Sequence, residues 1–488
     1  MDADRVSTCV DAVVVGSGPN GLSAAVTLAQ RGASVLVVEG QEDFGGGTRT
    51  AALTRPGFRH DVCSACHPMG VLSPFFRTLR LEEHGLRWMK PTASVAHPLV
   101  GQPAVLLAGS LVETAKSLGE DGAAYERLVG PLLAAPHDLL DDVLGPLRIP
   151  KHPLRMLRFG LEAIRSASGL ARDRFSGARA RALFAGCAAH SILPLDRLTT
   201  AAVALVFCMT AHVEPWPVAE GGSAAIAQAL VRLLASLGGR VETGRWIRSL
   251  AELPAARVYL FDTSPAQLAS IAEPILPPSY VRRLRRYRYG PGVFKIDWAL
   301  DGPIPWRDPA ILGASTVHVG GTLDEIAASE AAVWRGEQPE RPFVLVCQQS
   351  LFDPSRAPEG KHTGYAYCHV PAGSTRDLTD VIEKQIERFA PGFRDRVLGR
   401  HTMNTADFER YNPNLVGGAI TGGVGDLAQL IARPVARWNP YTTPHPRVYL
   451  CSSSTPPGAG VHGMCGHHAA LAALRRIPRL TDAPLGKA

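Results

Sequence analysis

Glycines near the start of the chain, spaced two and three residues apart, have the clearest chemical meaning in this sequence. The segment Gly16-Ser17-Gly18-Pro19-Asn20-Gly21 follows an apolar run at 12–15 and precedes a helical pattern that stops at Gly32. A second apolar run, 34–38, ends at Glu39. A strand, a glycine turn, a helix, a second strand and an acidic residue, in this order, are typical of a dinucleotide-binding site.

Each glycine of the turn meets a separate physical demand. Gly16 allows a tight turn, Gly18 lets the backbone approach a pyrophosphate, and Gly21 lets the helix pack closely on the strand. Pro19 and Asn20 then begin the helix, whose free N–H groups and positive dipole end attract the diphosphate. The turn therefore predicts a diphosphate site.

The residues after the turn indicate which dinucleotide is bound. Glu39 is expected to accept hydrogen bonds from the adenosine ribose hydroxyls, which favours an unphosphorylated ribose over NADP. A second glycine segment follows a few residues later and suits a long, extended ligand such as FAD. Its residues are Gly46, Gly47, Thr48 and Arg49.

The C-terminal part of the chain contains a further Pro- and Gly-rich loop. A buried strand is predicted at 447–452, the loop spans 455–463, and an alanine-rich helix follows from Met464. A helix N-terminus that reaches the cofactor would stabilise negative charge on the pyrimidine end of a reduced flavin.

Together these segments resemble the phytoene desaturase and carotenoid isomerase branch of the flavin amine oxidase superfamily. The resemblance implies FAD bound without a required covalent link. It also implies that the backbone of Ile247 holds the adenine, and that the C-terminal loop contacts the cofactor through Ser453, Gly460, Val461, Gly463 and Met464. Two positions depart from the pattern of these relatives, because Ala419 stands where an acid is common and Ala459 where a third glycine is common.

Three residues are candidates for catalytic roles because of the resemblance. Lys295, on a strand predicted at 292–300, matches a lysine that holds a water against the flavin, and a surface lysine at a strand end is the alternative. His462 lies in the cofactor loop, where it either contacts flavin or substrate or packs the loop. His67 follows a segment that passes near the flavin ring in relatives, and a simple His-Pro corner is the alternative.

The string Cys63-Ser64-Ala65-Cys66-His67 has the CxxCH spacing of c-type haem attachment, and its CxxC spacing is that of a redox dithiol. Haem attachment requires export, and residues 1–6 show no secretory signal. We interpret the string as a loop whose small residues pack near the cofactor. Nine cysteines suit reduced thiols in the cytoplasm, and no metal site is expected.

Length and composition indicate a folded protein of two domains. At 488 residues the chain exceeds one ordinary core, and 46% of it is hydrophobic. A net charge of +7 is only mildly basic, no nucleic-acid motif is present, and no apolar run reaches the roughly 18 residues of a membrane span.

The predicted fold class is α/β, with a Rossmann-type FAD-binding domain built from discontinuous segments. We assign 1–110, 217–265 and 415–488 to this domain, with strands at 240–243, 246–247 and 257–263. The intervening segments, 111–216 and 266–414, form an α+β substrate-binding domain with a mixed or antiparallel sheet, whose further strands are predicted at 343–347 and 364–370.

A basic stretch interrupts the substrate domain. Residues 147–182 hold nine Lys or Arg against Glu162 and Asp173 as the only acids, with apolar residues interleaved. Such a stretch is either the solvated outer layer of the domain or a surface that lies on an anionic membrane. The expected location is therefore cytoplasmic, with peripheral membrane contact left open.

These observations lead to the hypothesis of an FAD-dependent dehydrogenase that takes a hydride from carbon of a small apolar substrate and forms a double bond. A reduced-FAD-dependent cis/trans isomerase of a polyene and an amine oxidase are the alternatives, as is a flavin-bearing scaffold without activity. No second GxGxxG is present, so oxygen or a quinone is favoured over NAD(P) as electron acceptor.

Overall fold

The computed structural model of the chain describes residues 10–475. A five-stranded parallel sheet has the order β16-β10-β1-β2-β9. The sequence favours a parallel sheet because its central strands are almost wholly apolar, as strands covered on both faces must be. The bounds are β1 Val10–Val15, β2 Val35–Val38, β9 Arg240–Glu242, β10 Ala256–Phe261 and β16 Val448–Leu450.

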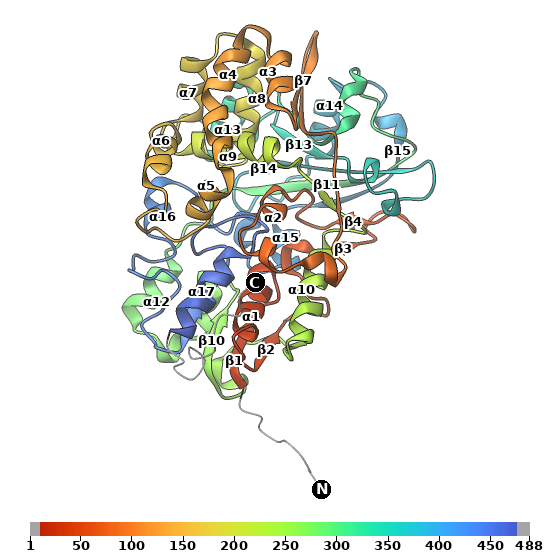
Figure 1. Cartoon of the computed structure of the whole chain (residues 1–488). Coiled ribbons are helices and arrows are strands. Elements are labelled where there is room, and N and C mark those ends of the chain that lie inside the picture. Colours follow the sequence, from red (N-terminus) through yellow and green to blue (C-terminus); the bar gives the residue numbers. More distant parts are fainter. Residues whose placement is uncertain (1–9, 476–488) are drawn as a thin grey trace.

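Helices cover both faces of the parallel sheet, in the lower half of Figure 1. Residues of α1, α10 and α17 share one hydrophobic core with Val14 and Val37, and residues of α11 and α12 share another with Val13 and Val38. The helix bounds are α1 Pro19–Ala29, α10 Ala224–Ser236, α11 Pro265–Ile271, α12 Pro278–Arg285 and α17 Met464–Leu474.

A second, seven-stranded sheet has the order β15-β11-β14-β13-β12-β6-β7. Its neighbouring strands are antiparallel except for β12 and β6, which are parallel. The bounds are β6 Ala93–Leu99, β7 Gln102–Ala108, β11 Gly292–Leu300, β12 Ala314–Val319, β13 Val344–Cys347, β14 His362–Val370 and β15 Val397–Met403.

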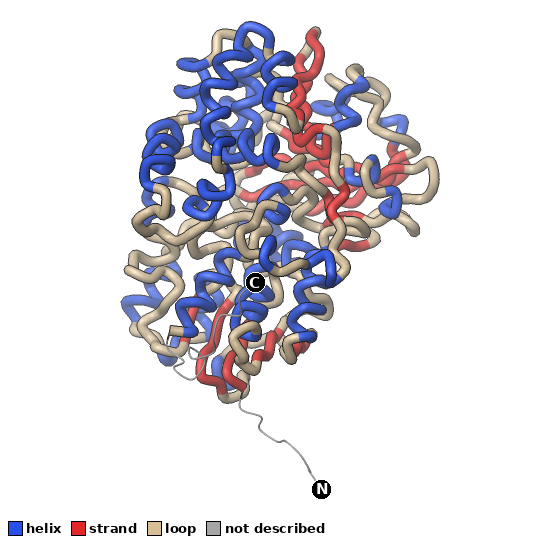
Figure 2. Tube along the Cα trace, viewed as in Figure 1, coloured by secondary structure: helices blue, strands red, loops and turns tan. Residues whose placement is uncertain are grey.

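Helices pack on both faces of this sheet as well. Figures 1 and 2 show a large helical layer beside it, and α14 Thr379–Glu387 lies apart from that layer and packs on Trp298 of β11. The layer consists of α3 Leu111–Ser117, α4 Gly122–Val129, α5 Pro136–Val143, α6 Pro153–Ala163, α7 Ala167–Arg174, α8 Ala178–Ala189, α9 Thr200–Val213 and α13 Leu323–Trp334.

Short elements fill the region between the two sheets. Two small antiparallel pairs, β3–β4 and β5–β8, connect segments that leave the parallel sheet. The bounds are β3 Thr50–Ala51, β4 His60–Asp61, β5 Trp88–Met89, β8 Val218–Ala219, α2 Pro68–Val71, α15 Thr405–Tyr411 and α16 Leu427–Ile431.

The two sheets confirm the predicted fold class, and two local features differ from expectation. The segment 246–247 is not a strand, because the indole of Trp246 packs against Gly40 at the end of the sheet: a Cβ on Gly40 would lie 2.3 Å from Trp246 Cε3. The predicted division places β6 and β7 in the FAD-binding segment 1–110. In the structure these strands belong to the seven-stranded sheet. Residues 1–9 and 476–488, which belong to the predicted terminal segments, lie outside the described residues.

Buried histidines make the stability of this fold sensitive to acid. Burial lowers the pKa of several imidazoles from 6.5 to about 4, so the unfolded chain binds more protons between these values. The free energy of unfolding therefore falls as the pH drops from about 6.5 to about 4. The groups concerned include His60, His67, His97, His212, His462 and His468.

Chemical denaturation at a series of pH values measures this dependence. Asp262 acts in the opposite direction, because burial raises its pKa to about 7, but it is one group against these histidines, to which His190 and His467 add in the same direction. The substitution His97→Gln removes one titrating ring and is expected to reduce the slope. A stability that does not change between pH 6.5 and 4 would contradict the prediction.

Candidate functional site

The glycine turn between β1 and α1 has the geometry that its sequence predicts. Gly16 has φ +97°, a conformation that side chains rarely adopt, and a Cβ on Gly21 would lie only 2.1 Å from Gly16 O. A Cβ on Gly18 would lie 2.6 Å from Asp262 Oδ2. Each glycine is therefore required by close packing in the protein itself.

Asp262, which follows β10, is a site residue that the sequence analysis did not single out. Its Oδ2 accepts a hydrogen bond of 2.9 Å from the N–H of Gly21, and burial raises the pKa of Asp262 to about 7. The carboxyl group therefore holds the glycine turn against the neighbouring strand. An acid directly after the buried strand pattern at 257–261 is the signal that would have indicated it.

Glu39 is buried at the end of β2, where the protein fixes both oxygens of its carboxylate. Oε2 accepts hydrogen bonds from Ser17 N (3.0 Å) and Ser17 Oγ (2.6 Å). Oε1 accepts them from Gln41 N (2.9 Å) and from Arg49 Nη2 (3.3 Å). Glu39 lines the main cavity, so these contacts give the carboxylate a defined orientation there.

The second glycine segment lies directly on the first turn. Gly46 has φ +53°, and a Cβ there would lie 2.9 Å from Gly18 Cα. The hydroxyl of Tyr411 donates a hydrogen bond of 2.8 Å to Gly46 O, and the guanidinium of Arg49 lies 5.4 Å from the centre of the Tyr411 ring. The two glycine segments thus form one backbone surface.

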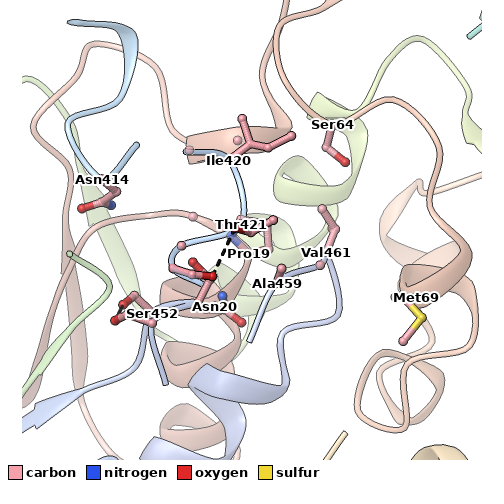
Figure 3. Close-up of a pocket in the computed structure, with 18 of the residues that line it drawn as sticks. Pro19, Asn20, Ser64, Met69, Asn414, Ile420, Thr421, Ser452, Ala459 and Val461 are labelled. Carbon is pink, nitrogen blue, oxygen red and sulfur yellow. Dashed lines mark hydrogen bonds between the residues drawn. The ribbon is translucent and has the colours of Figure 1, made fainter. Parts of the chain in front are cut away.

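The C-terminal loop supplies another part of the cavity wall. Figure 3 shows Ala459 and Val461 of this loop close to Pro19 and Asn20 of the glycine turn. Ser453 and Gly460 also line the cavity, whereas Gly463 and Met464 do not. A Cβ on Gly463 would lie 2.1 Å from Ser23 Oγ of α1, so this glycine serves helix packing.

His462 is fully buried and is not part of the cavity lining. Its Nδ1 accepts a hydrogen bond of 3.0 Å from the N–H of Met464, and its Nε2 donates to Ala459 O at 3.2 Å. Burial lowers the pKa of His462 to about 4, which agrees with a neutral ring. These contacts favour the alternative in which His462 packs the loop.

His67 lines the cavity, and its tautomer follows from its neighbours. The hydroxyl of Ser223 donates its proton to Ser64 O (2.6 Å), so His67 Nε2 must carry the proton that it shares with Ser223 Oγ (2.9 Å). Burial lowers the pKa of His67 to about 4. His67 is therefore neutral, with Nδ1 left as an acceptor 3.4 Å from Ser64 Oγ.

A buried ion pair anchors the segment that leads to His67. Arg356 Nη1 lies 3.0 Å from Asp61 Oδ2, and both side chains are wholly buried. Burial alone would raise the pKa of Asp61, but Arg356 and the N–H of Ser223 (2.7 Å) lower it. Asp353, which also binds Arg356 at 2.7 Å, completes a network that the sequence analysis did not identify.

Lys295 lies on β11 as predicted, but the structure does not bring it into the cavity lining. Its ammonium pairs with Asp297 in a fully buried ion pair and lies 4.5 Å from the centre of the Tyr365 ring. Tyr365 itself lines the cavity. Lys295 is therefore one side chain behind the wall, and it is not the surface lysine of the alternative interpretation.

A single cavity of about 740 Å³ connects these parts. Both glycine segments, Glu39, Ile247, His67 and the C-terminal loop line this cavity. The structure therefore brings these predicted residues together, although it confirms no individual role for any of them. The cavity continues into the substrate-domain helices, where sequence reasoning gave no signal. The lining there includes His190, Ile192, Val203, Val206, Phe207, Trp216, Leu345 and Tyr367.

The residues of the cavity fit a dinucleotide. Asn20 Oδ1 and Thr263 Oγ1 are buried without a hydrogen-bond partner in the described part of the protein, and both residues line the cavity beside the glycine turn. A ligand with hydroxyl and phosphate groups supplies such partners. Among residues 10–475, no group of His, Cys, Asp or Glu has a geometry suited to a metal ion.

The fold and the cavity together indicate a Rossmann-type dinucleotide-binding domain joined to a second domain, a fold also found in amine oxidases of known structure. Residues 14–79 match the family model described as an NAD(P)-binding Rossmann-like domain. Within the described part of the chain, no helix is long and apolar enough to cross a membrane.

Comparison with known proteins agrees with this class. The chain is 27% identical to the rat (Rattus norvegicus) pyridine nucleotide-disulfide oxidoreductase domain-containing protein 2, over 96% of this chain and 94% of the relative. It is 33% identical to one of the limonene dehydrogenase subunits of Castellaniella defragrans, over only 23% of this chain and 20% of that protein. Putrescine oxidase has a similar structure, with a TM-score of 0.62, 19% identity and coverage of 96% of this chain and 99% of that one.

The position of Lys295 predicts a stability effect. The substitution Lys295→Met removes the cation and leaves Asp297 buried without its partner, which is expected to cost about 3–5 kcal/mol in the free energy of unfolding. The double variant Lys295→Met/Asp297→Leu removes both charges and is expected to recover most of the loss. Urea denaturation of the three proteins provides the measurement, and equal stability of the two variants would contradict the pairing.

Proposed function

We propose that this chain is an FAD-dependent dehydrogenase that removes a hydride from carbon of an apolar organic substrate and forms a double bond. The observation that carries the proposal is the continuous cavity, which begins at the glycine turn and ends among apolar helix residues. FAD supplies the hydride acceptor when bound. The two glycine segments, Glu39 and the C-terminal loop would hold and orient it, and the apolar end would exclude water.

The chemistry of the far end of the cavity supports an uncharged substrate. Val203, Val206 and Phe207 come from α9, and the rings of Phe207 and Trp216 lie 4.9 Å apart. Among the described lining residues the carboxylates are Glu39, Asp142 and Asp262. The first and last lie at the glycine turn, and Asp142 accepts hydrogen bonds from the backbone N–H groups of residues 151 and 152.

Asp142, the carboxylate of the described lining that lies away from the glycine turn, is already engaged by these N–H groups, which disfavours a cationic amine, because a buried ammonium needs a paired charge. An amine oxidase therefore remains only an alternative, although putrescine oxidase shares the fold. The resemblance to phytoene desaturases and the short match to the limonene dehydrogenase chain agree with an apolar substrate. A polyene isomerase would use the same apolar cavity and is the other alternative.

Anaerobic mixing of the FAD-loaded protein with polyenes, cyclic terpenes and amines tests the proposal. We expect an apolar substrate to bleach the flavin absorbance and to yield a product that has lost two hydrogen atoms. Bleaching by amines alone would instead support an amine oxidase, and a product of unchanged mass would support the isomerase. Oxygen and a quinone, added afterwards, are expected to restore the absorbance faster than NAD(P).

A variant with a charge at the apolar end of the cavity tests whether the substrate binds there. Val203 lines the cavity on α9, so Val203→Asp is expected to lower the rate of flavin reduction at least about tenfold, or ~1.4 kcal/mol, while FAD stays bound. The control Val112→Asp changes an exposed residue of α3 that does not line the cavity. Equal rates in the two variants would rule out this end as the substrate site.

We also propose that the basic stretch docks on an anionic membrane. Leu154, Leu157 and Leu161 of α6 are 82%, 60% and 65% exposed, and Ile149 beside them is 90% exposed. Leu147, Arg148, Met156 and Phe159 of the same stretch line the cavity, so the apolar surface continues into it. Exposed apolar side chains next to basic ones suit an interfacial helix, through which an apolar substrate would pass from lipid to the site.

Flotation with vesicles that contain phosphatidylglycerol tests this surface. We expect the wild-type protein to float with anionic vesicles, less so at high salt, and the variant Leu154→Asp/Leu157→Asp to remain in solution. Val100→Asp, in the exposed turn between β6 and β7, is the control and is expected to float. The membrane proposal is wrong if the α6 variant floats as well as the control. It is also wrong if light scattering shows that α6 mediates self-association instead.

A further inference from the structure

Two cysteines that are far apart in the sequence meet in the wall of the cavity. Cys66 lies in the segment between β4 and α2, and Cys347 is the last residue of β13. Their sulfur atoms are 3.8 Å apart, and both residues line the cavity. The CxxC spacing in the sequence suggested Cys63 as the partner of Cys66, whereas the structure provides Cys347.

The surroundings distinguish this pair from the other thiols. Cys66 is partly exposed, and its sulfur lies 3.8 Å from Ser315 O as well as from the Cys347 sulfur. The hydrogen bond between the two sulfurs lowers the pKa of Cys66 and raises that of Cys347. Burial raises the pKa of Cys63 to about 11, so Cys63 is less reactive than Cys66.

Apart from Cys63, the other described cysteines do not share this access. Cys187 and Cys208 lie on the packed helices α8 and α9, are fully buried, and do not line the cavity. A small molecule inside the cavity therefore reaches Cys66 and Cys347 without local unfolding. A disulfide requires sulfur atoms about 2.05 Å apart, so closure needs a movement of less than about 2 Å.

We propose that Cys66 and Cys347 form a reversible disulfide when hydrogen peroxide enters the cavity. The Cys66 sulfur attacks one peroxide oxygen: an S–O bond forms, the O–O bond breaks, and the departing hydroxide takes the thiol proton to give water. The Cys347 sulfur then attacks the Cys66 sulfur: the S–S bond forms, the S–O bond breaks, and a second water leaves with the Cys347 proton. The thiols lose two electrons, and peroxide is reduced to two waters.

The disulfide would connect the two halves of the site. Cys66 is adjacent to His67, in the segment anchored by Asp61 and Arg356, whereas Cys347 belongs to the seven-stranded sheet. The bond would fix this segment on the sheet and change the wall between the cofactor and substrate ends. The source of the peroxide rests on the proposed function, because flavoproteins that use oxygen as electron acceptor release hydrogen peroxide. The thiol chemistry itself does not depend on the proposed function.

Added hydrogen peroxide tests the pair without any substrate. The FAD-loaded protein is treated with peroxide, its remaining thiols are blocked with N-ethylmaleimide, and its peptides are identified by mass spectrometry. We expect a peptide pair joined through Cys66 and Cys347 that disappears on treatment with dithiothreitol. We expect the same joined pair in Cys63→Ser, which keeps the reacting residues, and none in Cys66→Ser or Cys347→Ser.

Trapping with dimedone assigns the order of attack. In Cys347→Ser the sulfenic acid on Cys66 has no partner thiol, so a dimedone adduct is expected at residue 66. In Cys66→Ser no adduct is expected on Cys347. A disulfide between Cys63 and Cys66, irreversible oxidation of Cys66 in the wild type, or two unreacted thiols would each overturn the proposal. The anaerobic reduction experiment is unaffected by these outcomes, so failure of the thiol pair and failure of the dehydrogenase proposal are separable.

Discussion

The close packing of α1 on α17 is the contact on which the site depends. A Cβ on Gly466 would lie 1.7 Å from Asn20 O, and one on Gly463 would lie 2.1 Å from Ser23 Oγ. Only glycine allows the two helices to approach so closely. Because of this contact, the glycine turn at the beginning of α1 and the loop before α17 face each other across one cavity, and each supplies a wall that the other lacks.

Buried charges hold the remaining wall in place. Arg356 connects Asp61 of β4 with Asp353, and its Nη2 also donates to Ala219 O at 3.1 Å, so three distant segments share one guanidinium. Lys295 and Asp297 form a second buried pair behind Tyr365. A buried pair contributes little net stability, but the loss of one partner is costly. Such pairs therefore define which segments meet, and here they position His67 and the neighbouring thiols.

The sequence indicated those parts of the site whose residues are close together in the chain. The glycine turn, Glu39 and the helix pattern after them are local, so periodicity and spacing were sufficient to predict the parallel sheet. Arg356 and the pairing of Cys66 with Cys347 depend on contacts between segments that are remote in sequence, for which spacing gives no signal. The orientations of His462 and Lys295 likewise depend on their interaction partners. Backbone groups hydrogen-bond the imidazole of His462, and Asp297 forms an ion pair with the ammonium of Lys295.

The position of β16 at the edge of the parallel sheet has a consequence for biosynthesis. The strand pairs with β10, and the loop and helix that follow it complete the cavity. A ribosome makes these residues after the rest of the cavity lining, so a nascent chain cannot enclose the ligand until 448–474 have emerged. Contacts of such long sequence separation also slow folding. During this interval the face of α1 that packs on α17 in the folded protein has no partner helix.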